Sequence, residues 1–112
     1  MIILEKYLER LNHSDLYNKL PEDNDNLIIY KTNRDRRIGL LRYNKSPIGK
    51  LFLFIMPDEE IINFHTIGMK FNIDILFYDK SGKLVSSYLN IKPGVKSISS
   101  ISKIKYAIEV PQ

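Results

Sequence analysis

Every odd-numbered residue between positions 67 and 77 is apolar, and the intervening positions are mainly polar or small. A period of two is typical of a strand with one buried face, and a helix does not satisfy it. The run leads into Asp79-Lys80-Ser81-Gly82, which has the Asp-first, Gly-last pattern of a tight turn, and then into a second strand-like segment. This stretch therefore predicts a β-hairpin and, with it, an antiparallel β domain.

The apolar pattern elsewhere in the chain extends this prediction. Residues 51–56 are continuously apolar, as expected of a short strand covered on both faces, and Pro57 is expected to end it. Residues 33–41 read as a short helix or turn. Further strands are predicted at 27–30, 61–69, 73–78, 84–89 and 104–110. We therefore expect a small antiparallel β-barrel or sandwich of roughly six to seven strands.

The N-terminal segment has a different period. Leu4, Leu8 and Leu11 recur at helical spacing, so residues 2–12 predict an amphipathic helix. We expect a single domain over 1–112, in which residues 1–21 form a helical extension and residues 26–111 form the β domain.

Composition narrows the functional classes. The chain has 112 residues and no cysteine, which excludes disulfides, thiolate metal sites and a cysteine nucleophile. It has no apolar run of the roughly 20 residues that span a membrane, and its first residues do not resemble a secretion signal. The sequence thus predicts a cytoplasmic protein without a membrane partner, without a cofactor or metal, and either monomeric or weakly dimeric.

The net charge of +4 is concentrated in one segment. Residues 31–50 contain seven basic side chains and a single acid, Asp35. Such a patch can bind nucleic acid, with arginines on phosphates and the nearby Tyr30 and Tyr43 stacking on bases. A solvated helix face, or arginines paired with carboxylates such as Glu109, is the simpler interpretation. The candidate nucleic-acid-binding residues are Arg34, Arg36, Arg37 and Arg42.

Three side chains in the β region could carry chemistry. Asp74 lies on the face opposite Ile73 and Ile75, either partly desolvated or accepting backbone N–H groups near a turn. His65 could act with Asp74 or Glu109 as an acid–base pair or as two ligands of a metal site, or it could be a hydrogen-bonded strand residue. Glu109 is in the opposite phase to the apolar residues of the last strand, where an exposed glutamate is the default.

Several short patterns resemble a known family when taken in order. They are Arg36-x-x-Gly39-Leu40, Gly49-Lys50-Leu51-Phe52-Leu53-Phe54, His65-Thr66-Ile67-Gly68-Met69-Lys70-Phe71-Asn72-Ile73-Asp74, and Ile108-Glu109-Val110-Pro111. Together they are similar to domain-of-unknown-function family 192 over roughly residues 26–111. Asn72 departs from the resemblance, because the family usually has proline there. The resemblance implies a compact all-β domain and no defined activity.

The sequence leaves three functions open. The first is a non-catalytic module that binds a small molecule or a protein at a pocket or rim formed by His65, Met69, Asp74 and Glu109. The second is nucleic-acid binding through residues 31–50. The third is a small hydrolase or lyase that uses His65 with Asp74 or Glu109. No catalytic residue is assigned.

Overall fold

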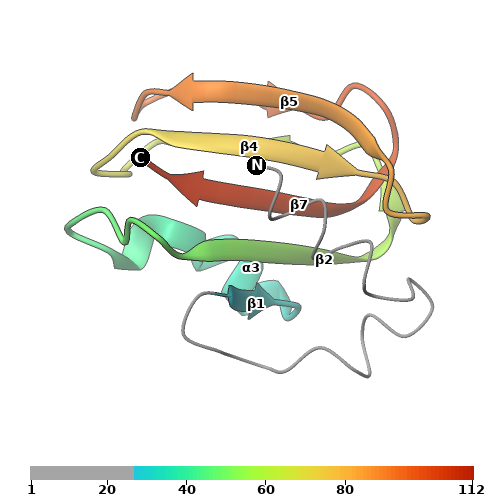
Figure 1. Cartoon of the computed structure of the whole chain (residues 1–112), viewed down its shortest axis with the longest axis horizontal. Coiled ribbons are helices and arrows are strands. Elements are labelled where there is room, and N and C mark those ends of the chain that lie inside the picture. Colours follow the sequence, from blue (N-terminus) through green and yellow to red (C-terminus); the bar gives the residue numbers. More distant parts are fainter. Residues whose placement is uncertain (1–26) are drawn as a thin grey trace.

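The computed structural model describes residues 27–112, which contain seven β-strands, one short α-helix and one 3₁₀-helix (Figure 1). The helices are α3 (Asn33–Ile38) and η2 (Gly39–Arg42). The strands are β1 (Leu27–Tyr30), β2 (Leu51–Glu60), β3 (Asn63–Phe64), β4 (Ile73–Tyr78), β5 (Leu84–Ile91), β6 (Ile98–Ser99) and β7 (Ile104–Pro111). The helical segment predicted for residues 1–21 lies outside the described residues.

Five strands form one sheet in the order β1-β2-β7-β4-β5, and β3 pairs with β6 in a small second sheet. The predicted antiparallel arrangement holds for every pair except one, because β1 runs parallel to β2. A parallel neighbour needs a crossover connection, and here α3 and η2 lie in that connection. In the described part of the chain β1 and β5 are the edges of the large sheet, so it is mainly β but does not close into a barrel.

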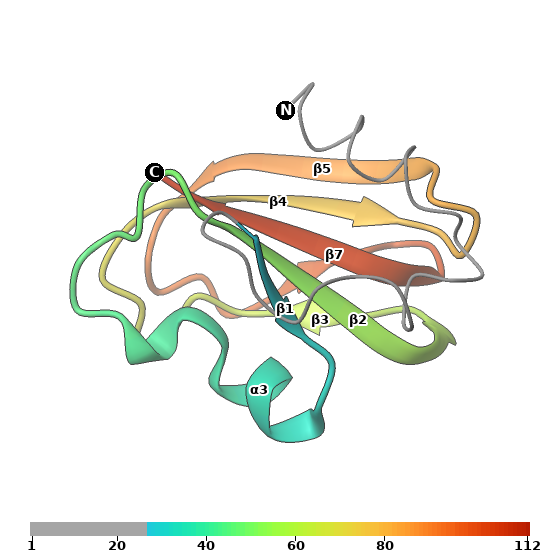
Figure 2. The same cartoon turned by 60° about the horizontal axis from the view of Figure 1, so that its bottom comes forward.

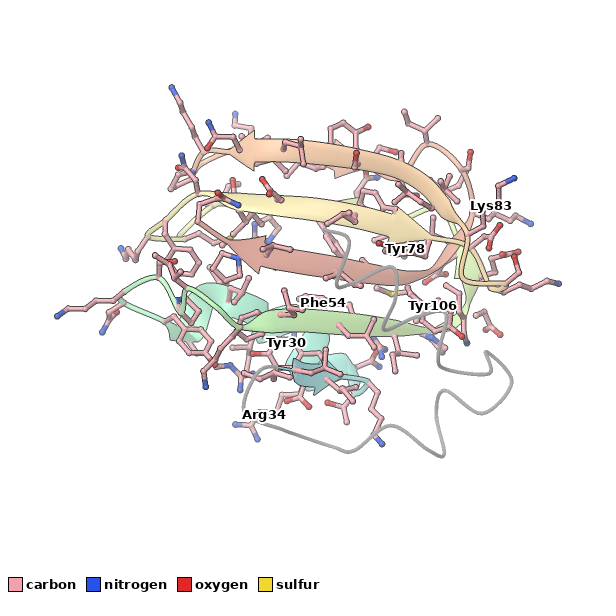
Figure 3. All side chains as sticks on the ribbon, viewed as in Figure 1. Tyr30, Arg34, Phe54, Tyr78, Lys83 and Tyr106 are labelled. Atoms are coloured by element: carbon pink, nitrogen blue, oxygen red, sulfur yellow. The ribbon has the colours of Figure 1, made fainter. Side chains whose placement is uncertain are left out.

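The large sheet buries apolar side chains on both of its faces. One face, which we call the pocket face, packs with residues of η2, β3 and β6, including Leu40, Phe64 and Ile98. Figure 2 shows α3 and β3 below this face of the sheet. The other face, the second face, buries a separate cluster drawn from β1, β2, β4 and β7: Leu27, Leu53, Ile55, Leu76, Tyr78, Tyr106 and Ile108. Tyr78 and Tyr106 of this cluster pair across β4 and β7 (Figure 3).

The odd-numbered residues of the alternating run are buried from Met69 onward, as predicted, but the run forms a strand only in its second half. Ile73, Ile75 and Phe77 are fully buried in β4. Residues 67–72, however, form turns rather than strand, and the side chain of Ile67 is 49% exposed. The Met69 N–H bonds to the Thr66 carbonyl 3.1 Å away, and Gly68 has a φ of 86°, a backbone conformation that suits glycine and ends the extended chain.

Two other boundaries differ from the prediction. The strand expected over 61–69 is limited to Asn63–Phe64. β2 does not end before Pro57 but continues to Glu60, with an irregular register against β7 between Ile55 and Glu60. Proline is tolerated at such an irregularity because no ladder hydrogen bond is required of its nitrogen there.

The predicted hairpin turn between β4 and β5 is confirmed. The Asp79 Oδ1 atom accepts hydrogen bonds from the backbone N–H groups of Ser81 and Lys83, each at 3.0 Å. Burial acts to raise the pKa of the Asp79 carboxyl, but these hydrogen bonds and that of the Ser81 hydroxyl outweigh it and lower the pKa below its ordinary value. The turn therefore depends on an ionised aspartate at its first position.

Candidate functional site

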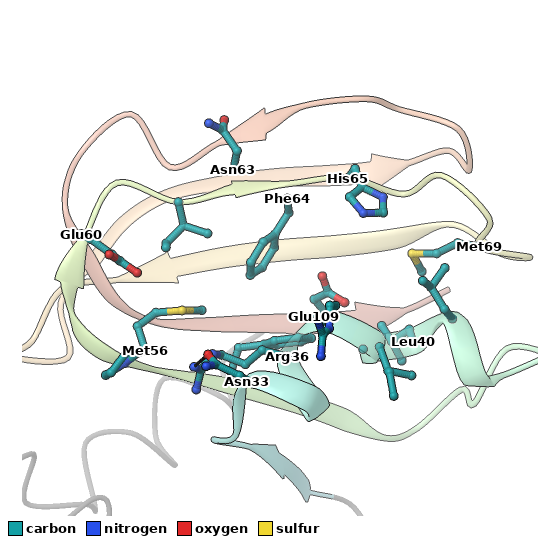
Figure 4. A pocket seen from close by; sticks show the side chains of 17 residues that line it. Asn33, Arg36, Leu40, Met56, Glu60, Asn63, Phe64, His65, Met69 and Glu109 are labelled. Carbon is teal, nitrogen blue, oxygen red and sulfur yellow. Dashed lines mark hydrogen bonds between the residues drawn. The ribbon is translucent and has the colours of Figure 1, made fainter.

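A pocket of about 380 Å³ lies on the pocket face, between the large sheet and the segment that contains α3 and η2 (Figure 4). Its lining comes from α3, η2, β2, β3, β7 and the loops on either side of β3. The apolar lining includes Leu40, Phe54, Met56, Ile62, Phe64 and Met69, and the polar lining consists of Asn33, Arg36, Arg37, Glu60, Asn63, His65 and Glu109. An apolar cleft with a few polar groups is the usual form of a small-molecule site.

Glu109 is the buried acidic residue of this pocket. It lies in the middle of β7, between Phe52 of β2 and Ile75 of β4, and only 6% of it is exposed. Within residues 27–112, no hydrogen bond or ion pair engages its carboxyl group. Burial raises the pKa of Glu109 to about 8, because the ionised form loses its hydration and gains no compensating charge. At neutral pH the carboxyl group is therefore mostly protonated, and it can both donate and accept a hydrogen bond.

The phase of Glu109 was predicted correctly, but its exposure was not. Ile108 packs on the second face, and the next residue of a strand points to the opposite face. Glu109 therefore lies on the pocket face, as Ala107 does. A lone exposed glutamate was the default expectation. It is wrong because this face carries a second layer formed by η2, β3 and β6.

His65 and Met69 line the same pocket from the loop after β3. The His65 Nδ1 atom accepts a hydrogen bond from the Ile67 N–H at 3.2 Å, which assigns the proton of a neutral imidazole to Nε2. The neighbouring Thr66 is fully buried, and its hydroxyl bonds to the Lys92 carbonyl and the Val95 N–H. These bonds fix the loop that carries His65 and Met69.

Asp74 is not among the residues of the pocket lining. Its Oδ1 atom accepts the backbone N–H of Asn90 at 2.7 Å, and its Oδ2 atom accepts a side-chain N–H of Gln112 at 2.8 Å. The structure thus brings His65, Met69 and Glu109 together, whereas Asp74 ties the start of β4 to the end of β5 and the C-terminal residue.

The arginines of the basic segment have different surroundings. Arg36 binds the carbonyl oxygens of Lys31 and Ile55, the latter at 3.0 Å, and the Asn33 side chain. It therefore fastens α3 to β2. Arg37 is exposed at the pocket rim, and neither it nor Arg36 forms an ion pair with Glu109 within residues 27–112.

Arg42 and Arg34 complete the basic segment. The Arg42 guanidinium lies 4.9 Å from the centre of the Tyr30 ring and 3.7 Å from the Asp35 carboxylate. Arg34 is exposed and points away from the sheet (Figure 3). Two of the four arginines thus have internal partners, whereas Arg34 and Arg37 form no hydrogen bond or ion pair through their side chains within residues 27–112.

Sequence reasoning missed several pocket residues. The sequence places Arg36 and Arg37 in a basic patch, whereas α3 carries them to the pocket, and of the apolar lining it singles out only Met69 as a site residue. The adjacency of Phe64 to His65 was one available indication, because consecutive residues of a short segment can border the same space.

Residues 27–112 contain no group of three or more histidine, aspartate and glutamate side chains that could hold a metal ion. Nor does this part of the chain contain a helix with the length and apolar character needed to cross a membrane.

Comparisons with other proteins support the fold. The model of the family DUF192, described as "Uncharacterized ACR", matches residues 19–112. No curated protein sequence matches the chain. A crystal structure from Sinorhizobium meliloti 1021, of a protein named as a candidate transcription regulator, is similar with a TM-score of 0.70 and 17% identity, over 76% of this chain and 67% of that one.

A second similar crystal structure is that of a protein of unknown function from Novosphingobium aromaticivorans. It has a TM-score of 0.70 and 13% identity, and the match covers 76% of this chain and 61% of that one, so this chain spans less than two thirds of its length. At these identities the likeness concerns the fold alone.

Proposed function

Because this chain belongs to the DUF192 family, which is described only as uncharacterized, we propose its function from the pocket itself: it is a binding module for a small organic molecule. The observation that carries the proposal is Glu109, a buried carboxyl group that faces a cavity and lacks a partner within residues 27–112. A bound molecule that enters the cavity can supply a hydrogen bond to this carboxyl group.

The size and lining of the pocket support the same proposal. A volume of about 380 Å³ is within the range of about 300–1,000 Å³ that small-molecule sites occupy. Phe54, Phe64 and Met69 supply apolar contact area, and His65 supplies an N–H donor from Nε2 at the rim. The arrangement can therefore hold an apolar body and orient a polar group.

The alternative functions have less support. For nucleic-acid binding, Arg36 and Arg42 already have internal partners, which reduces the cations available for phosphates. For hydrolysis or elimination, His65 and Glu109 share a pocket, but Asp74 is engaged elsewhere. We therefore place ligand binding first.

Methionine methyl groups give a direct test. Met56 and Met69 both line the pocket, so ¹³C-methyl labelling of methionine reports on its occupancy. A library of small aromatic and aliphatic fragments is titrated into the full-length protein. We expect some fragments to shift both methyl resonances in a saturable way. If no fragment moves either resonance at millimolar concentration, the pocket is not a ligand site.

A further inference from the structure

We infer that the pocket selects a primary amine on a compact apolar body, with the ammonium group of the ligand paired to the Glu109 carboxylate. This inference rests on the proposed function and names the class of ligand. The side chain of Glu109 rises from β7 into the pocket, toward the side formed by Phe64 and His65 (Figure 4).

The charged side chains around the pocket are of both signs, so the preference for a cation rests on Glu109 itself. The titratable side chains that face it are Arg36 and Arg37 from α3, Glu60 from β2, and His65 from the loop after β3. The Arg36 guanidinium is directed to two backbone carbonyls and the Asn33 side chain. Burial raises the pKa of Glu109, whereas a nearby arginine would lower it. No arginine therefore neutralises the Glu109 carboxylate. A charged donor bonds a carboxylate more strongly than a neutral donor does, particularly away from water.

The rest of the lining defines the body of the ligand. Phe54, Phe64, Leu40 and Met69 surround the space beside Glu109 with aromatic and aliphatic groups. A volume of about 380 Å³ accommodates one aromatic ring with a short alkyl arm. An aryl-alkyl amine such as phenethylamine therefore satisfies the apolar walls and the carboxylate together.

Binding of such an amine is coupled to release of a proton. The carboxyl group of free Glu109 is mostly protonated below pH 8, but an ammonium ion pairs with the ionised form. The proton of Glu109 therefore goes to solvent when the ligand binds. Only the ionised fraction is competent, so affinity is expected to rise roughly 50-fold between pH 6 and pH 8 and to level off above that range.

The experiment compares three probes that share one body: phenethylamine, 2-phenylethanol and phenylacetate. Their dissociation constants for the full-length protein are measured between pH 6 and pH 9 by methionine-methyl NMR, and proton release is measured by calorimetry in buffers of different ionisation enthalpy. Glu109→Gln removes the titrating group while keeping its shape. Asp74→Asn is the matched control, because Asp74 lies outside the pocket, and His65→Asn separates any effect of the imidazole.

We expect phenethylamine to bind most tightly, with an affinity that rises with pH and with release of protons. Glu109→Gln should weaken it at pH 8 by at least tenfold and abolish the pH dependence, whereas Asp74→Asn should change neither property. If 2-phenylethanol or phenylacetate binds better than the amine, the inference is overturned although the pocket still binds ligands. The same holds if the pH dependence survives in Glu109→Gln. If no probe binds but other fragments shift the methyl groups, the amine preference is wrong and the proposed function stands. If no molecule binds, both fail.

Discussion

Glu109 links the stability of the fold to pH, because its carboxyl group is neutral in the folded protein at pH values where it is ionised in the unfolded chain. Its pKa rises from an ordinary value of 4.5 to about 8 on folding. A raised carboxyl pKa means that stability is fully present below pH 4.5 and is lost as pH rises toward 8. The difference between these two pKa values corresponds to a loss of about 3–5 kcal/mol in the free energy of unfolding.

Glu109→Gln should remove this loss. Urea unfolding of the wild type and the variant is compared at pH 5 and pH 8.5, and the variant should gain stability relative to the wild type at the higher pH. Asp74→Asn is the control, since the Asp74 carboxylate is held by Asn90 and Gln112 outside the pocket. Parallel pH profiles for wild type and Glu109→Gln would contradict a buried, unpaired carboxyl group.

Arg36 has a structural role that the exposed Arg34 of the same helix lacks. Its guanidinium joins α3 to the Ile55 carbonyl of β2. Arg36→Ala should therefore destabilise the fold by about 1–3 kcal/mol, the usual cost of losing hydrogen bonds from a charged donor. Arg34→Ala, on the exposed side of the same helix, should change the free energy of unfolding little. Equal effects in chemical denaturation would mean that Arg36 does not fasten α3.

At the scale of elements, β4 contributes buried side chains to the clusters on both faces of the large sheet. Phe77 is fully buried in the cluster of the pocket face and contacts the rings of Phe64 and Tyr88. Phe77→Ala should cost about 3–5 kcal/mol in unfolding free energy. Ile67→Ala, at the exposed first residue of the same alternating run, should cost far less. A small effect at Phe77 would contradict the packing described for β4.

Much of the sheet could be predicted from the sequence, because the spacing of apolar residues and the residue types of a turn are local properties of the chain. The alternation over β4, the Asp79 turn and the apolar run of β2 each identify an element from adjacent residues. Residues 67–72 were misassigned because Gly68 and the Thr66–Met69 hydrogen bond interrupt the strand while the apolar alternation continues. The parallel pairing of β1 depends on a crossover, which no local pattern reveals.

The candidate site was harder to predict, since its residues are far apart in the sequence. His65 and Met69 lie in one short loop, and Glu109 reaches them only because β7 lies in the centre of the sheet. Asp74 looked similar to Glu109 in the sequence, since both are acids on strands between apolar residues. Only tertiary structure separates them, because Asp74 meets Asn90 and Gln112 at the strand end whereas Glu109 faces a cavity.

At the scale of the whole molecule, the second face of the sheet suggests a role for the N-terminal segment. Within residues 27–112, the second-face cluster and its partly buried neighbours all come from strands of the large sheet. The amphipathic pattern predicted for residues 2–12, with Leu4, Leu8 and Leu11, offers an apolar stripe that could cover it. We therefore expect residues 1–20 to protect this face.

Deletion of residues 1–20 should lower the melting temperature and the solubility of the protein, because apolar surface becomes exposed. In the full-length chain, Leu8→Asp should act in the same direction, whereas Glu9→Ala, on the polar side of the predicted helix, should not. An unchanged melting temperature and no aggregation after the deletion would show that the second face does not depend on this segment.

The most direct test of the account is the titration of Glu109 itself. The side-chain carboxyl ¹³C resonance of Glu109 is followed by NMR from pH 4 to pH 10, without and with saturating phenethylamine, and is assigned with Glu109→Gln. We expect a midpoint near 8 for the free protein. With the amine the midpoint should be lower by more than one pH unit, because the ammonium ion stabilises the carboxylate. A free midpoint near the ordinary value of 4.5, unmoved by the amine, would contradict the central claim that Glu109 is an unpaired group in a ligand pocket.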